Sequence, residues 1–503
     1  MMDTKKRSFL GRCFALALCA ISVAASPLGA AEISVFDKPL TYYLTVSQTA
    51  AFGWHDEYDT YKGLRQALST AIVEGDYSPV DNIKMYGMLA CTADLAYVFN
   101  RDSSEWQEKG FDASSDNLAI DSEYWRILKE FHATWTSGNA MVRVGKQTVL
   151  WGELIYFKLL DQINANDGIR GLTDLEVETT LIPNWLLRAD YAIPYSSAMV
   201  SDLNFQLVYN PNVDPDLFYH PLSGNTGFGV WAPYAKAGPY LLGEGTYNFD
   251  TPEAWKDGKI AVRLQGLIGN TMASINFVFG RDIGFLAIPD STRTTITTEN
   301  GQPLIHGYYD CFFPIRKMVG GMFATELTDI RWFNMAAPML RVEWSYQWDS
   351  TFTRTVGATT TLEEHDDARL GASLEMAFPI RWLNPKNMVK LSTIGFVKRI
   401  SGIDDGYENV RGSTEGAVQE SNYNTAMSLS SSYHAGQITP SFTWIQDWTN
   451  DSNIMKPTIS YVPSYRWSFS LGVTFFSGRK KGQGLEIYDH KDNVSFKVQY
   501  KWG

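Results

Sequence analysis

The sequence predicts an all-β fold, a transmembrane antiparallel β-barrel of about 16 strands (roughly 14–18) with long loops on one rim. Many segments alternate apolar and polar residues with a period of two, as strands with one apolar face do. Aromatic residues make up 14% and charged residues 19% of the 503-residue chain, which suits a wall with one lipid face and one wet face. No segment beyond the N-terminal region has about 18 consecutive apolar residues, so helical membrane spans are excluded.

The first 31 residues have the pattern of a secretory signal peptide. Basic residues precede an apolar stretch over 13–25, and small residues at 29–31 precede Glu32. We therefore expect residues 32–503 to form the mature barrel, located in the outer membrane of a Gram-negative cell. A lipoprotein signal at Cys19 is a less favoured alternative, because a bulky leucine precedes that cysteine.

Charge and cysteine content narrow the function classes. The formal net charge of −12 disfavours a nucleic-acid partner. Beyond the signal peptide only Cys91 and Cys311 remain, and no CxxC spacing supports a metal or haem site, so we expect no cofactor and no metal. A Cys91–Cys311 disulfide and two separate thiols both fit the sequence.

The alternation is clearest near the C-terminus. In 494–502 the apolar residues from Val494 to Trp502 alternate with polar ones, and 465–475 and 340–348 show the same period. Trp502 provides a terminal aromatic strand of the kind that usually closes outer-membrane barrels, although Gly503 follows it. In chain order, the expected strands lie near 40–53, 63–75, 82–100, 124–137, 140–150, 176–194, 202–210, 258–269, 271–281, 315–328, 338–349, 367–379, 388–400, 422–434, 436–448, 463–476 and 491–502.

The number of these segments is odd, whereas single-chain bacterial barrels have even numbers of strands. One segment is therefore miscounted, or one strand is missed between 282 and 314 or between 449 and 476. This is why we expect about 16 strands rather than the number of segments.

The connections are of two kinds. Tight turns are expected at 137–139, 269–270 and 434–437, where glycine and asparagine favour hairpins. Long connections are expected at 101–123, 151–175, 210–257, 281–314, 349–366 and 401–421. Loop 151–175 is a candidate constriction loop, because an apolar run precedes its Asp/Asn cluster. Loop 210–257 is a candidate lid or plug, because it is long and rich in proline and in aromatic residues, among them Phe218, Tyr219, Trp231, Tyr234 and Tyr240.

Charged residues share the polar register of the strands. An arginine on the lipid face near mid-membrane would cost about 2–4 kcal/mol, so these residues are expected to face the lumen. Salt bridges that stiffen the wall and contacts to a solute are both open roles. The inward strand residues are Arg143, Arg188, Arg263, Arg341, Arg369, Asp190, Glu343 and Glu375. The candidates for lumen or substrate contact are Arg143, Lys146, Asp161, Asn164, Asp167, Arg188, Asp190, Arg263, Arg341 and Glu343.

Four stretches carry a family resemblance: RVGKQTVLWGE at 143–153, LLDQIN at 159–164 with Asp167, IPNWLLRADY at 182–191 and LRVEWSYQW at 340–348. They resemble a Gram-negative outer-membrane barrel family catalogued as domain of unknown function 1302, which is porin-like and associated with export. The chain departs from that pattern at Ala165, where the family usually has proline, so the loop geometry is expected to differ there. The resemblance implies an outer-membrane barrel associated with export or transport.

We therefore expect a porin-like channel or export barrel that moves a solute across the outer membrane, and no enzyme. An outer-membrane lipase or protease that uses His132 is one alternative, and a non-conducting receptor or scaffold of an envelope complex is another. The expected partners are outer-membrane lipid and lipopolysaccharide, a small solute and an envelope export system. The acidic loops 101–123 and 401–421 fit either a solvated face or divalent-cation bridging to lipopolysaccharide.

Overall fold

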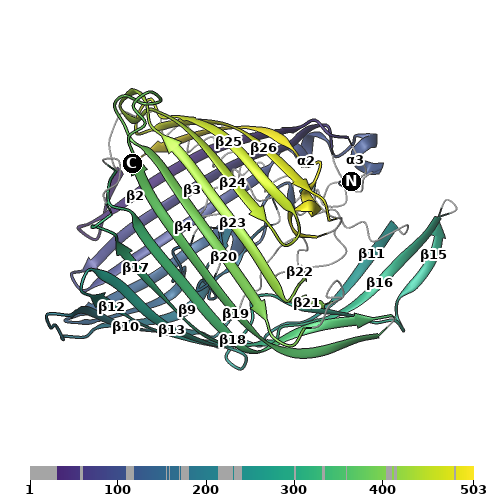
Figure 1. Ribbon diagram of the computed structural model, residues 1–503, viewed down its shortest axis with the longest axis horizontal. Helices are drawn as coiled ribbons and strands as arrows, with labels where there is room; N and C mark the ends of the chain where they lie inside the picture. The colour runs from purple at the N-terminus through teal and green to yellow at the C-terminus, as the bar shows by residue number, and fades with distance from the viewer. Residues whose placement is uncertain are drawn as a thin grey trace.

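A closed wall of tilted antiparallel strands surrounds a lumen (Figure 1). The computed structural model describes residues 31–56, 61–108, 111, 118–154, 156–157, 159–168, 170, 180–212, 230–231, 241–299, 302–330, 335–357, 359–403, 410–412, 416–480 and 483–502. Strand β2 (Lys38–Gly53) pairs with β3 (Gly63–Val80) on one side and with the last strand, β27 (Asn493–Trp502), on the other. These two pairings close the sheet, so the all-β antiparallel barrel expected from the sequence is confirmed.

The other wall strands run in chain order from β3 round to β27, and each pairs with the next. They are β4 (Ile83–Asp94), β5 (Leu128–Ser137), β6 (Ala140–Gln147), β9 (Asn184–Ala192), β10 (Val200–Asn210), β12 (Lys259–Ile268), β13 (Thr271–Arg281), β17 (Ile315–Glu326), β18 (Met339–Val356), β19 (Thr359–Phe378), β20 (Val389–Ile400), β23 (Ser421–Ser431), β24 (Ile438–Asp447), β25 (Ser452–Tyr461) and β26 (Trp467–Gly478).

The described part of the wall has 18 strands, which lies at the upper end of the expected range of 14–18 and is two more than the favoured number of about 16. The strand missing from the sequence-based set is β25, which lies in the second of the two intervals where a miss was expected. Pro457 explains why it was missed. Proline has no N–H to donate, and the pairing of β25 with β26 skips Lys456 and Pro457.

The two faces of the wall differ in chemistry. Along β18, Glu343, Ser345 and Gln347 are buried, whereas Trp344 and Tyr346 between them are 38% and 39% exposed. Because successive strand residues point to opposite faces, the polar set faces the lumen and the aromatic set faces outward. The same outward belt continues over neighbouring strands with Ile260, Leu264, Ile275, Phe277 and Phe323. An apolar outer belt on a closed barrel is the surface that lipid solvates.

The strand connections differ in length between the two rims. Turns as short as 138–139 and 269–270 lie on one rim, and the connections 95–127, 148–183, 211–258 and 282–314 lie on the other. The long connection expected at 349–366 is wrong, because β18 and β19 extend through this interval and pair as far as Val356 and Thr359. Beyond the long-loop rim, β14 (Leu286–Pro289), β15 (Thr295–Glu299), β16 (Gln302–Phe312) and β11 (Leu241–Asp250) form a separate four-stranded sheet. This rim sheet projects past the barrel at the right of Figure 1. The interval 282–314 therefore contributes strands to the rim sheet and none to the wall in the part of the chain that the structure describes.

The remaining described elements are short. They are strands β1 (Ala31–Val35), β7 (Ala165–Asn166), β8 (Leu181–Ile182), β21 (Val410–Gly412) and β22 (Gly416–Ala417), helices α2 (Ala96–Phe99), α3 (Ser104–Glu108) and α5 (Tyr124–Ile127), and 3-10 helices η4 (His434–Gly436) and η5 (Gly484–Tyr488). Among the described residues, no helix has the length and hydropathy needed to cross a membrane. Cys91 lies in β4 and Cys311 in β16, and they do not form a disulfide with each other.

Candidate functional site in the barrel lumen

The connection after β6 turns into the lumen. We call its described residues, 148–154, 156–157 and 159–164, the inner loop. Trp151, Leu154, Leu159, Leu160 and Ile163 of this loop are all buried and form one apolar cluster with residues of the wall. The wall residues of that cluster come from seven strands: they are Leu186, Val208, Ala261, Val278, Met318, Met322, Ala324, Ile394 and Ala426. The inner loop is therefore packed against the inside of the wall.

The Trp151-Gly152-Glu153 turn is held from within the loop by Asp161. Its Oδ1 accepts hydrogen bonds from the backbone N–H of Trp151 at 2.5 Å and of Gly152 at 2.8 Å. The indole N–H of Trp151 donates to Oε1 of Gln206 on β10 at 2.6 Å. A Cβ on residue 152 would lie 3.0 Å from Asp161 Oδ2, so the close approach of this carboxylate favours glycine.

Strand β18 clamps the same turn from the wall. Oε1 of Glu343 accepts hydrogen bonds from the backbone N–H of Glu153 and, at 3.0 Å, from that of Leu154. Arg341 forms ion pairs with Glu153 at 2.7 Å and with Glu375 of β19 at 2.6 Å. The sequence stretches 143–153 and 340–348 thus meet in space, a contact that sequence reasoning did not predict.

The far end of the inner loop is anchored by polar contacts of its own. Oδ1 of Asn164 accepts a hydrogen bond from the backbone N–H of Val149 at 2.7 Å, which ties the two ends of the loop together. Gln162 binds to two cations of the wall: its side-chain oxygen accepts from Arg316, and its backbone carbonyl accepts from Nζ of Lys259 at 2.8 Å. Sequence reasoning did not single out Gln162, Lys259 or Arg316.

Asp282, in the connection after β13, completes this anchor. It pairs with Arg316 at 2.7 Å. Burial acts to raise the pKa of Asp282, but the opposing charge of Arg316 keeps the pKa of this carboxyl below its ordinary value. The anchor is therefore a charged pair near neutral pH.

Asp167 lies just past the inner loop in a buried cluster of ion pairs. It pairs with Arg126 at 2.8 Å, and Asp121 pairs with Arg126 at 3.1 Å and with Arg170 at 2.6 Å. Burial acts to raise the pKa of Asp121, but Arg170 and Arg126 hold the pKa of this carboxyl below its ordinary value. Asp121 lies in the acidic stretch 101–123, but it is buried and paired with two arginines, so this residue is not part of a solvated face.

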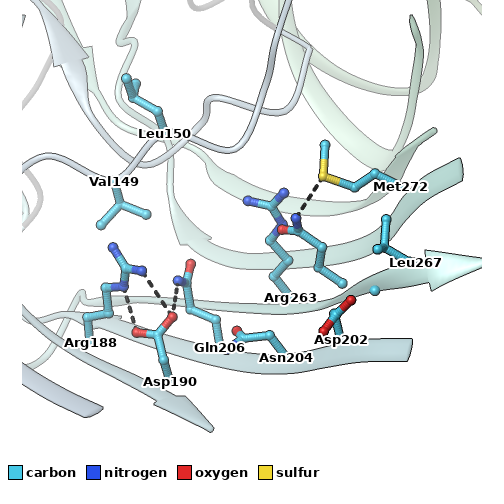
Figure 2. Close-up of a pocket in the computed structure, with 12 residues that line it drawn as sticks. Val149, Leu150, Arg188, Asp190, Asp202, Asn204, Gln206, Arg263, Leu267 and Met272 are labelled. Atoms are coloured by element: carbon cyan, nitrogen blue, oxygen red, sulfur yellow. Dashed lines mark hydrogen bonds and ion pairs between the residues drawn. The ribbon is translucent and has the colours of Figure 1, made fainter. Parts of the chain in front are cut away.

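A pocket of about 320 Å³ lies between Val149–Leu150 and the inward faces of β9, β10, β12 and β13 (Figure 2). Its lining residues near the turn at 269–270 place it toward the short-turn rim. The lining consists of Val149, Leu150, Arg188, Asp190, Asp202, Asn204, Gln206, Arg263, Gln265, Gly266, Leu267 and Met272. Figure 2 shows the guanidinium groups of Arg188 and Arg263 extending from the strands toward the side where Val149 and Leu150 lie.

The inward arginines fall into two groups. Arg188 pairs with Asp190 at 2.7 Å, Arg341 pairs as described above, and Arg369 pairs with Asp367 at 2.6 Å. In the described part of the chain, by contrast, no carboxylate lies within ion-pair distance of Arg143 or Arg263. Arg143 donates to Oγ1 of Thr134 at 2.9 Å, and Nη2 of Arg263 lies 4.0 Å from the sulfur of Met322. The paired arginines fit the role of salt bridges that stiffen the wall. Arg143 and Arg263 fit the role of contacts to a solute.

Of the predicted site residues, the structure brings Arg188, Asp190 and Arg263 together in the pocket. Asp161, Asn164, Arg341 and Glu343 hold the inner loop, and Asp167 belongs to the ion-pair cluster. Lys146 is 1% exposed, and its Nζ donates to the backbone carbonyls of Trp125 and Leu128 at 2.7 Å. Arg143 lies beside Arg188, its pairing partner on β9.

The candidate lid loop 210–257 is described only at residues 210–212, 230–231 and 241–257, so Phe218, Tyr219, Tyr234 and Tyr240 lie outside the described residues. Val230 and Trp231 are buried with Tyr97 and Trp106 in a second apolar cluster. The backbone N–H of Val230 donates to the hydroxyl of Tyr97 at 3.0 Å, and its carbonyl accepts from Nζ of Lys491 at 3.0 Å. This point of the loop is thus fixed against Tyr97 in the connection after β4 and against Lys491 just before β27.

His132 is the residue on which an enzyme reading depends. Its Nε2 lies 3.4 Å from Oε2 of Glu130, and its ring packs against Tyr86 at 5.4 Å. Within the residues that the structure describes, no hydroxyl or thiol hydrogen-bonds to this imidazole, so the nucleophile of a catalytic triad is missing there. No group of three or more His, Cys, Asp or Glu residues suited to a metal ion occurs in the same ranges.

A closed antiparallel barrel with an apolar outer belt, long loops on one rim and a loop folded inward defines an outer-membrane, porin-like barrel. The chain belongs to the family described as "Protein of unknown function (DUF1302)", whose model matches residues 92–502. The resemblance seen in the sequence motifs is thereby confirmed. No curated protein matches the chain.

Several solved outer-membrane channels are similar in fold. OccAB4 of Acinetobacter baumannii is 10% identical with a TM-score of 0.49, and the match covers 95% of this chain and 99% of that one. OccK5 (OpdH) of Pseudomonas aeruginosa is 10% identical with a TM-score of 0.48, covering 93% of this chain and 99% of that one. The outer membrane channel DcaP of Acinetobacter baumannii is 10% identical with a TM-score of 0.41, covering 94% of this chain and all of that one. At these identities the likeness concerns the barrel fold alone.

Proposed function

We propose that the protein is an outer-membrane channel through which a small solute crosses, and that the inner loop sets the width of its pore. The observation that carries the proposal is the packing of the inner loop in one apolar cluster with residues of seven wall strands, beside a polar pocket. A barrel of this strand number has a lumen wider than its own side chains fill. A loop held inside such a lumen narrows the route that remains.

The anchors of the inner loop support a permanent constriction rather than a loose flap. Asp161, Glu343 and Asn164 each bind backbone N–H groups of the loop, and Arg341 and Arg316 bind its side chains. Hydrogen bonds to charged groups contribute about 1.5–3 kcal/mol each, and the burial of the loop's apolar side chains adds to them. The loop is therefore proposed to remain in place while solute passes.

The location and partners follow from the same proposal. An apolar outer belt needs lipid around it, which favours the cell outer membrane, reached through the signal peptide at 1–31. An envelope export system is the proposed partner if transport runs outward. Lipopolysaccharide is the proposed neighbour of the acidic connections 101–123 and 401–421.

Planar-bilayer recording tests the channel directly. We expect the purified full chain to insert and give discrete conductance steps that are proportional to voltage, because a constriction of fixed width conducts in this way. Protein unfolded by heat before addition serves as the control and gives no steps. If folded protein inserts into liposomes, as shown by flotation, and yet never conducts, the channel proposal is wrong.

A non-conducting receptor is the second candidate, and the rim sheet favours it. Tyr247 of β11 stacks on Tyr309 of β16 with ring centroids 5.0 Å apart, and Phe249 contacts Phe285 at 5.1 Å. A projecting sheet with such an aromatic row is a surface suited to a partner. A receptor of this kind is expected to insert into liposomes, as shown by flotation, and to give no conductance.

A further inference from the structure

We propose that the pocket beneath Val149 and Leu150 binds a small amphipathic carboxylate, whose anionic end pairs with Arg263 and whose apolar body lies against Leu150, Leu267 and Met272. The inference rests on the proposed function, because it names the class of solute that the channel holds on its way. Two features of the pocket carry the inference: the charged side chains that lack an ion-pair partner, and the apolar side chains that remain exposed.

Arg188 and Asp190 neutralise each other. Nε and Nη2 of Arg188 lie 2.7 Å and 3.0 Å from the two carboxylate oxygens of Asp190. Asp190 also accepts a hydrogen bond from Nε2 of Gln206 at 2.6 Å. Neither residue therefore has much charge left for a ligand.

Arg263 is the cation that remains. Among the described residues, no carboxylate lies within ion-pair distance of its guanidinium, and its Nε is buried without a hydrogen-bond partner. The carboxylates whose charges act on Arg263 are already engaged: Glu153 pairs with Arg341, and Asp161 and Glu343 accept hydrogen bonds from the inner loop. A partly buried arginine without an anionic partner is costly, and a carboxylate that accepts from its N–H groups removes that cost.

Asp202 is the other carboxylate that lines the pocket, and its negative charge acts against an anionic ligand. It accepts a hydrogen bond from the hydroxyl of Ser201 at 3.0 Å and sits at a bulge of β10 near the short-turn rim. Figure 2 places Asp202 on the side of the pocket away from Val149 and Leu150. Its charge would repel a second negative group on the part of the ligand near Asp202. We therefore expect the ligand to carry a single carboxylate.

The apolar part of the pocket defines the rest of the ligand. Leu150 is 55% exposed although the loop that carries it lies in the lumen. Met272 has its sulfur 3.0 Å from Nε2 of Gln265, and Leu267 lies beside it. Covering such surface with an apolar ligand body is favourable by about 25 cal/mol per Å². A volume of about 320 Å³ accommodates a small molecule and is at the lower end for ligand pockets.

Calorimetric titration of the purified full chain in detergent micelles tests the assignment, with 3-phenylpropionate as the probe and its neutral amide, 3-phenylpropanamide, as the comparison. We expect saturable binding of the acid and binding of the amide that is roughly tenfold weaker or more, because the charged pair is lost. Arg263→Gln is expected to weaken binding of the acid by a similar factor. Arg263→Lys retains the charge and is expected to bind within a few-fold of the wild type.

Arg399→Gln is the matched control, since that arginine is 71% exposed and pairs with Glu420 outside the lumen. Each variant is first checked for the heat-modifiable migration of a folded barrel. Equal affinity for acid and amide, unchanged affinity in Arg263→Gln, or no saturable binding by the wild type overturns the inference. Conductance without binding refutes the inference and leaves the channel proposal standing. Binding that depends on Arg263, without conductance, supports the inference and refutes the channel proposal.

Discussion

Glu343 is the residue on which the position of the inner loop most depends. Its side chain is 1% exposed, and its Oε1 accepts two backbone N–H groups of the loop, those of Glu153 and Leu154. The two N–H groups depend on this carboxylate as their acceptor, so removing the Glu343 side chain removes this attachment of the loop to β18. Ser345, two residues along the same inward register, is also buried, but its hydroxyl has no hydrogen-bond partner among the described residues.

We expect Glu343→Ala to destabilise the folded barrel by roughly 2–4 kcal/mol, because two buried N–H groups lose their acceptor. The free energy of unfolding, measured by urea titration in lipid vesicles, checks this. Ser345→Ala is the matched control and is expected to change stability by less than about 0.5 kcal/mol. Equal effects of the two substitutions would contradict the role given to Glu343.

At the scale of elements, buried charges join connections that are far apart in the chain. Asp121 follows α3, Arg126 belongs to α5, and Asp167 and Arg170 follow the inner loop. Breaking a buried ion pair by removing one partner typically costs about 3–5 kcal/mol. The cluster is therefore expected to hold these two connections together at the long-loop rim.

The lowered pKa of Asp121 makes this contribution depend on pH. The unfolded carboxyl titrates near pH 4, and the folded one titrates lower. The stability that the charged form adds is thus fully present above about pH 5 and is lost as the pH falls through the folded pKa, below about 4. We expect the stability difference between wild type and Asp121→Asn to be constant from pH 5 to 7 and to shrink below pH 4.

Asp102→Asn is the control for this pH dependence, since Asp102 is exposed on the same connection. Its unfolding free energy is expected to follow that of the wild type throughout. A stability difference between wild type and Asp121→Asn that grows as the pH falls would have the wrong sign and would contradict the ion-pair account.

At the scale of the whole molecule, the apolar outer belt of the barrel is suited to contact with membrane lipid. Ile275 lies in the middle of β13 and is 52% exposed, and Ile296 lies in the rim sheet and is 68% exposed. The two isoleucines have similar exposure, but only the first faces the membrane. We expect Ile275→Arg to cost about 2–4 kcal/mol in lipid vesicles and Ile296→Arg to cost little. Equal costs would argue against a membrane around the wall.

The sequence was sufficient for the barrel because alternation is a local signal, as at Val494–Trp502. It failed where a local rule is broken, as at Pro457 in β25. The inward position of Arg341 and Glu343 was also predictable, since their register follows from the alternation. Their partners were not, because Glu343 and Glu153 are 190 residues apart, and no periodic pattern relates a wall strand to a loop. Arg316 and Gln162, separated by 154 residues, were missed for the same reason.

The central claim is that the inner loop narrows a conducting lumen, and single-channel conductance tests it most directly. The measurement compares the wild type with a variant in which residues 152–161 are replaced by a short Gly/Ser linker, and with a control in which the exposed turn 194–198 on the short-turn rim is replaced in the same way. We predict a several-fold larger conductance for the first variant, because the constriction is removed, and no change for the control. A conductance equal to that of the wild type in a folded loop variant would contradict it.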